Sequence, residues 1–256
     1  MTIQLLQGKC GLIVGVANEH SIAAGCGHAF RKAGADLAIT YANPKSKPFV
    51  EPVAKALDAS IFLPLDVEID EQLDAVFDAI QRKWGRLDFL LHSIAFCPKE
   101  DLHGRVTDCS RQGFAQTMNV SVYSFIQLAK RAEPLMKNGG CLLTMSYYGA
   151  EKVVDHYNIM GPVKSALEGT MRYMAAELGP KGIRVNAISP GPLKTRAGSG
   201  IDHFDELIEE ARRRAPEQHL VSIEDVGNMA MGLVSDLSRS VTGNVSYVDA
   251  GYHIMA

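Results

Sequence analysis

The sequence predicts an α/β protein, a single doubly wound domain in which helices cover both faces of a seven-stranded parallel sheet. Short, β-rich apolar runs alternate with longer segments of helical periodicity. Each run is almost continuously apolar, as expected for strands that are covered on both faces. No repeat, low-complexity tract or Gly/Ser-rich linker divides the 256 residues, so we treat 1–256 as one domain.

The elements follow one another in a regular order. The expected strands cover residues 9–16, 35–41, 60–65, 87–92, 140–146, 183–188 and 244–248. The expected helices lie near residues 21–33, 47–57, 70–83, 114–137, 157–178, 203–214 and 223–236. The two longest connections, 93–113 and 189–203, both follow strands. We therefore expect them at the carboxyl edge of the sheet, where doubly wound folds bind their ligands.

Composition and charge exclude several classes of function. The net charge of −3, without a basic stripe, argues against nucleic acid or a membrane surface as a partner. No apolar run approaches the roughly 18–20 residues that span a bilayer, and the first residues lack the basic region of a signal peptide. Five scattered cysteines and eight histidines without metal-binding spacing predict reduced thiols, a cytoplasmic protein and no metal site.

The loop after the first strand is suited to hold phosphate, although it lacks the usual G-x-G-x-x-G spacing. Gly15 allows a sharp exit from the strand. Ser21 stands where the next helix begins, so its hydroxyl and the free N–H groups there can hold an anion. Gly25 and Gly27 are expected to allow a close approach of this helix to the sheet. A plain loop with a helix cap is the alternative.

The ends of the second and third strands leave the type of nucleotide open. No acidic residue follows the second strand, at ITYANPKSK, where it would bind the ribose 2′-hydroxyl of NAD. Lys45 and Lys47 can meet a 2′-phosphate or be ordinary solvated lysines. Asp66, after the third strand, can accept a hydrogen bond from an adenine amino group or simply end the strand.

Tyr157 and Lys164 form a Y-x₆-K pair after the fifth expected strand. Seven residues make almost two full helical turns, so a helix would place both side chains on one face about 10 Å apart. A nearby ammonium group would lower the pKa of the phenol. Such a tyrosine can donate a hydrogen bond to a carbonyl oxygen as hydride arrives. Pro162 lies between them and predicts that the helix starts or is distorted there.

The whole chain resembles the short-chain dehydrogenase/reductases and, more narrowly, the bacterial enoyl-acyl-carrier-protein reductases. The matching segments are GVANEHSIAAG from Gly15, LDV at 65–67, HSIAF at 92–96, SYYGAE…YNIMGPVK, RVNAISPGPLKT at 184–195, SGI at 199–201, IEDVGN and VTG…YVDAGY. The wide glycine loop and the paired tyrosines separate these enzymes from the ketoreductases of the larger family. The resemblance implies a Rossmann-type fold.

The resemblance also implies an activity, NAD(P)H-dependent reduction of the trans-2 double bond of enoyl thioesters carried on acyl carrier protein in type II fatty acid biosynthesis. It favours NADH over NADPH and implies a cytoplasmic homotetramer. The implied catalytic residues are Tyr147, Tyr157 and Lys164, with Tyr157 bonding the thioester oxygen. The implied NAD-binding residues are Gly15, Ser21, Ile22, Asp66, Val67, Ser93, Ile94, Ala95, Lys164, Leu193 and Thr195. The candidates for substrate binding are Phe96, Tyr147, Tyr157, Met160, Ile201 and Phe204, with a substrate-binding loop and helix at about 193–214.

Several alternatives stay open. Met160 and Leu207 can line the acyl slot or belong to the core. Tyr148 has no role in the family and is expected to pack. The chain can instead be another short-chain reductase acting on a carbonyl, for example a 3-ketoacyl thioester, or a nucleotide-binding regulator without catalysis.

Overall fold

Seven strands form one parallel sheet in the computed structural model, which describes residues 4–195 and 204–255. The strands are β1 Cys10–Val14, β2 Asp36–Tyr41, β3 Ile61–Pro64, β4 Phe89–His92, β5 Gly140–Met145, β6 Ile183–Pro190 and β7 Val245–Val248. Their order is β3-β2-β1-β4-β5-β6-β7, so the direction of winding reverses between β1 and β4. This confirms the predicted fold class and places the crevice for ligands at that reversal.

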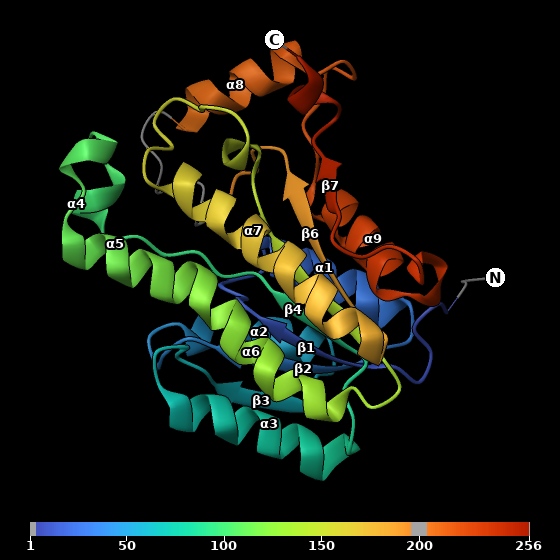
Figure 1. Ribbon diagram of the computed structural model, residues 1–256. Helices are drawn as coiled ribbons and strands as arrows, with labels where there is room; N and C mark the ends of the chain where they lie inside the picture. Colours follow the sequence, from blue (N-terminus) through green and yellow to red (C-terminus); the bar gives the residue numbers. More distant parts are fainter. Residues whose placement is uncertain (1–3, 196–203, 256) are drawn as a thin grey trace.

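Helices cover both faces of the sheet (Figure 1). They are α1 Ile22–Lys32, α2 Lys47–Ala56, α3 Asp70–Trp84, α4 Lys99–Leu102, α5 Arg111–Met118, α6 Ser124–Ala132, α7 Met160–Leu178, α8 Phe204–Arg214 and α9 Ile223–Val234. One face packs against α3, α6 and α7, and the other against α1, α2 and α9. Within the described ranges, no helix is both long and apolar enough to span a bilayer.

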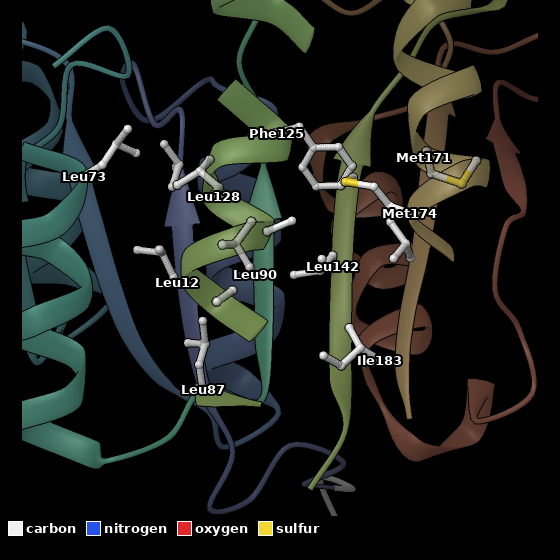
Figure 2. Packing of buried hydrophobic residues seen from close by; sticks show 14 of the residues in the cluster. Leu12, Leu73, Leu87, Leu90, Phe125, Leu128, Leu142, Met171, Met174 and Ile183 are labelled. Carbon is white, nitrogen blue, oxygen red and sulfur yellow. The ribbon is translucent and has the colours of Figure 1, made fainter. Parts of the chain in front are cut away.

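The central strands are buried on both faces, which explains their continuous apolar sequence. Leu12, Leu90 and Leu142 lie in register across β1, β4 and β5 and belong to the core under α3, α6 and α7 (Figure 2). The next residue of each strand points to the opposite core, under α1, α2 and α9. Two cores of this kind hold the carboxyl ends of the strands at one edge of a rigid sheet.

The expected helix over 157–178 is wrong at its start, because α7 begins at Met160. His156 and Asn158 have φ angles of 63° and 45°, a left-handed conformation that the interior of a right-handed α-helix excludes. Tyr157 therefore lies in the turn before the helix. Pro162 is the third residue of α7, where its missing N–H would have had no partner within the helix. The expected helix start near Pro162 is thus confirmed.

The expected helix over 114–137 is also divided. A π-helical turn, Asn119–Tyr123, separates α5 from α6, and a short 3₁₀ turn follows α6. Within the π-helical turn, the Ser121 hydroxyl accepts the N–H of Phe96 at 3.0 Å and donates to its carbonyl oxygen at 3.1 Å. The turn therefore fixes the segment that follows β4.

Gly25 packs against α9 rather than against the sheet, which corrects the expectation from the sequence. A Cβ atom at Gly25 would lie 2.4 Å from the carbonyl oxygen of Ile223, which is backbone and cannot move aside. We expect Gly25→Ala to lower the free energy of unfolding by about 1–3 kcal/mol, measured by urea denaturation. Gly232→Ala, in α9, is the control and should be neutral or stabilising, because a Cβ atom there would meet no other described part of the chain within 4 Å. Equal effects of the two changes would contradict this packing.

Candidate active site

A cavity of about 300 Å³ opens at the carboxyl edge of the sheet. Its wall combines the segments after β4, β5 and β6 with the starts of α1, α7 and α8. The structure brings most of the predicted site residues to this wall: Ile22, Ser93, Ile94, Ala95, Phe96, Tyr147, Tyr157, Met160, Lys164, Leu193, Thr195 and Phe204. Residues that are up to 182 positions apart in the chain, Ile22 and Phe204, thus meet at one site.

Four predicted cofactor residues, Gly15, Ser21, Asp66 and Val67, lie outside the cavity wall. Gly15 lies directly behind a residue of this wall, because a Cβ atom at Gly15 would lie 2.1 Å from the carbonyl oxygen of Ser93. The carboxylate of Asp66 accepts the N–H of Glu68 at 3.0 Å. The roles of these four residues stay predictions, as does that of Ile201, which lies outside the described residues.

The hydroxyl of Ser21 is engaged within its own loop. It donates to the carbonyl oxygen of Asn18 at 2.6 Å and does not cap α1. An anion at this helix end would therefore be held by the N–H groups of the first turn, beside Ile22 in the cavity wall.

Some residues of the wall were not among the site residues predicted from the sequence. They are Cys97, Leu102, Met145, Ser146, Pro190, Gly191 and Pro192. Apart from Leu102, they are the last residues of a strand or follow one closely, so their position at the carboxyl edge was a usable signal. Leu102 belongs to the short helix α4 and gave no such signal. Its carbonyl oxygen accepts from the Asn158 amide at 2.9 Å, beside Tyr157.

Tyr147 and Tyr157 face each other in the cavity. Their ring centroids are 4.7 Å apart with an angle of 63° between the planes, an edge-to-face contact. The Tyr147 hydroxyl is buried and has no hydrogen-bond partner among the described residues. A buried unpaired hydroxyl costs free energy, which a polar ligand in the cavity would recover.

Both phenols keep their protons at neutral pH. Burial raises the pKa of Tyr157, and the neighbouring Tyr147 raises it further. Burial likewise raises the pKa of Tyr147. The expectation that Lys164 lowers the pKa of Tyr157 is therefore wrong for this structure, because removal from water disfavours the charged phenolate. Each tyrosine can act as a hydrogen-bond donor to a ligand.

Lys164 is buried beside the end of β5. Its Nζ atom donates to the carbonyl oxygen of Met145 at 2.6 Å, and its side chain lines the cavity. Burial lowers the pKa of Lys164 to about 8, and the carboxylate of Glu168 opposes this effect. The ammonium group carries three donors, and two of them have no hydrogen-bond partner among the residues that the structure describes, so they are available to a ligand.

Nearby polar residues have structural roles. His92 is fully buried between the hydroxyls of Thr144 and Ser124, at 2.8 and 2.9 Å. Burial lowers its pKa to about 3, so it is a neutral packed histidine. Tyr148 packs edge-on against Tyr252, as expected from the sequence. Leu207 faces a separate hollow beside Tyr148, outside the wall described above.

The family model described as enoyl-(acyl carrier protein) reductase matches residues 15–253. The chain belongs to this family. An enoyl-[acyl-carrier-protein] reductase [NADH] of Rhizobium meliloti is 51% identical over 249 residues, 97% of this chain and 92% of that protein. The crystal structure of the corresponding NADH enzyme of Aquifex aeolicus superposes with a TM-score of 0.95 and 47% identity, covering 98% of this chain and 99% of that one.

A third similar protein connects the enoyl reductase family to its cofactor. The reductase of Anaplasma phagocytophilum, crystallised with NAD, superposes with a TM-score of 0.95 and 45% identity, covering 98% of this chain and 96% of that one. The present structure fits such a group. Gly15 leaves room that a side chain would fill, the first turn of α1 offers N–H groups, and Lys164 has spare donors. In the described part of the chain, no three His, Cys, Asp or Glu side chains are placed to hold a metal ion.

Proposed function

We propose that this protein is an enoyl-[acyl-carrier-protein] reductase that uses NADH to reduce the trans-2 double bond of enoyl thioesters in fatty acid biosynthesis. The main structural support for this activity is the arrangement of three side chains in the cavity. Tyr147 and Tyr157 pack edge to face in the cavity that Lys164 also lines, and the Tyr147 hydroxyl has no partner in the described protein. Membership of the enoyl reductase family and the names of the relatives support the same activity.

Tyr157, Tyr147 and Lys164 have different roles in the proposed reaction. NADH, when bound, supplies the hydride that adds to the β-carbon of the thioester. Tyr157 donates a hydrogen bond to the thioester oxygen and stabilises the negative charge that builds there. Its raised pKa keeps the proton available at neutral pH. Tyr147 orients Tyr157 and the thioester, Lys164 donates to the nicotinamide ribose, and a proton taken up at the α-carbon completes the reduction.

The apolar part of the wall suits an acyl chain. Phe96, Leu102, Met160 and Phe204 lie on it, and the hydrogen bonds from Ser121 hold Phe96 in place. Apolar walls with a few placed polar groups are typical of pockets for small molecules. We include Ile201 and the loop and helix at about 193–214 in the proposed substrate site.

We further propose a cytoplasmic homotetramer acting on substrates carried by acyl carrier protein. Large apolar side chains are exposed on the outer helices: Phe114, Tyr123, Ile126 and Tyr173. Exposed apolar surface of this kind is typical of protein–protein contacts. Sedimentation equilibrium should give four times the mass of one chain, and the mass of a single chain would contradict the assembly.

Binding of NADH should depend on pH through Lys164. The pKa of about 8 means that the ammonium form prevails below pH 8 and the neutral amine above it. Because the charged form offers the stronger donors, we expect the affinity to be level below pH 8 and to fall above it. His92, with a pKa of about 3, and both tyrosines, with raised pKa values, do not titrate in this range. Titration of the wild type between pH 6 and about 10 checks this, and a flat profile would contradict it.

Steady-state assays separate the activities that remain possible. NADH oxidation is followed with a crotonyl thioester and with a 3-ketoacyl thioester, each repeated with NADPH. We expect turnover of the enoyl substrate with NADH. Turnover of the ketone alone would identify a carbonyl reductase, and cofactor binding without turnover would identify a regulator. Either result would overturn the proposed function.

A further inference from the structure

A buried carboxylate lies one helical turn after Lys164. Glu168 is 3% exposed, and its Oε1 atom accepts a hydrogen bond from the Ser146 hydroxyl at 2.5 Å. Ser146 lines the cavity, whereas the other carboxylate oxygen of Glu168 lies 3.7 Å from the guanidinium of Arg172 at the surface. The reaction steps derived above do not use this carboxylate.

Two consecutive residues, Met145 at the end of β5 and Ser146 directly after it, are hydrogen-bonded to side chains of α7. Met145 accepts a hydrogen bond from Lys164, and Ser146 donates one to Glu168. Lys164 and Glu168 are four positions apart, so they lie on one face of the helix. The next residue along the chain is Tyr147, whose hydroxyl has no partner in the described protein. The hydrogen bond to Glu168 therefore holds Ser146, the residue directly before Tyr147, in place.

Glu168 is also the acidic residue that can serve as a counter-ion for the Lys164 ammonium group. The titratable groups described around the ammonium or in the same cavity wall are His92 of β4, Cys97, Tyr147, Tyr157 and Glu168 itself. His92 is neutral, and burial raises the pKa of the Cys97 thiol and of both tyrosines, so at neutral pH only Glu168 among them offers a negative charge. Its attraction opposes the loss of the lysine proton that burial causes.

A purely structural role explains this arrangement poorly. Burial disfavours the charged form of Glu168 and raises its pKa. An apolar side chain of similar size would fill the same space between α7 and the sheet without that cost. A buried ionisable group beside an active-site lysine is instead typical of functional tuning.

We propose that Glu168 is a positioning residue for the reductase site: its carboxylate, one helical turn after Lys164, is the counter-charge of this lysine, and its hydrogen bond to Ser146 holds the strand end that carries Tyr147. The proposal rests on the proposed function, in which Lys164 binds NADH and the two tyrosines act on the thioester. It adds a role for a residue outside the reacting groups.

Glu168→Gln tests the charge, because glutamine keeps the shape and can still accept from Ser146. We expect the midpoint of the pH profile of NADH binding to fall by about 1 pH unit, and kcat for a crotonyl thioester to fall while KM changes little. Glu168→Asp, which keeps the charge, should restore the wild-type midpoint in part. Glu177→Gln removes an exposed acid from the same helix and should leave the profile unchanged.

Ser146→Ala tests the hydrogen bond and leaves the carboxyl group of Glu168 in place. We expect kcat to fall by about tenfold, since one hydrogen bond to a charged group is lost, and the midpoint to move less than in Glu168→Gln. A wild-type midpoint in Glu168→Gln, an equal shift in Glu177→Gln, or wild-type kcat in Ser146→Ala would overturn the proposal. If the wild type reduced no enoyl thioester, the proposed function would fail, whereas the NADH-binding profiles would still decide the role of the charge.

Discussion

Replacing Tyr157 with phenylalanine should lower kcat for an enoyl thioester by about 10²–10³-fold, the typical cost of removing one donor from a developing oxyanion. The ring and its edge-to-face contact with Tyr147 would remain, because only the hydroxyl is lost. NADH affinity should therefore stay close to the wild-type value. Steady-state kinetics and fluorescence titration with NADH measure the two quantities separately.

Tyr148→Phe is the matched control for this change. Tyr148 is nine positions earlier, packs against Tyr252 and lies outside the cavity wall. Its hydroxyl should contribute nothing to turnover. If the two phenylalanine variants had the same kcat, Tyr157 would not be the donor to the thioester.

Lys164→Ala should affect both turnover and binding. The change removes the donors to the nicotinamide ribose and also frees the carbonyl oxygen of Met145. Hydrogen bonds to charged groups contribute about 1.5–3 kcal/mol, so the dissociation constant for NADH should rise by about 10–100-fold. We expect kcat to fall as well, since a misplaced cofactor reacts slowly.

Calorimetric titration with NADH gives the affinity of the Lys164→Ala variant, and circular dichroism shows whether the variant is folded. Lys164→Met keeps most of the side-chain volume and controls for the cavity that alanine leaves. Wild-type affinity in a folded Lys164→Met protein would refute the assignment of Lys164 to the cofactor.

The sheet could be predicted from the sequence because its strands are buried on both faces. Burial of both Leu12 and its neighbour Ile13, on opposite faces, requires apolar residues at every position of β1. The same reasoning placed the segments after β4 and β6 at the carboxyl edge, where the cavity was found. Parallel strands make this inference possible, since all their carboxyl ends meet at one edge.

The local geometry around Tyr157 could not be predicted in the same way. The spacing to Lys164 suggested one continuous helix, but the left-handed residues His156 and Asn158 place Tyr157 in a turn. Such conformations are set by tertiary contacts, here including the bond from Asn158 to the carbonyl of Leu102. The direction of the pKa shift of Tyr157 was missed for a related reason, because burial of its hydroxyl depends on the whole surrounding wall.

The roles of Glu168 and Ser121 also depend on contacts between distant segments. Ser121 lies in a π-helical turn and bonds the backbone of Phe96, 25 positions earlier. Glu168 meets Ser146 across 22 positions. Neither residue type nor spacing distinguishes these side chains from ordinary helical polar residues, so they could not be selected before the fold was known.

The fate of the hydride tests enoyl reduction most directly. NADH labelled with deuterium at the transferred position is incubated with the protein and a trans-2-enoyl thioester, and the product is analysed by mass spectrometry and NMR. We expect one deuterium atom at the β-carbon of a saturated acyl chain and, in deuterated water with unlabelled NADH, one at the α-carbon. A saturated product without cofactor deuterium at the β-carbon, or transfer of deuterium only when a 3-ketoacyl thioester replaces the enoyl substrate, would contradict the proposed reaction.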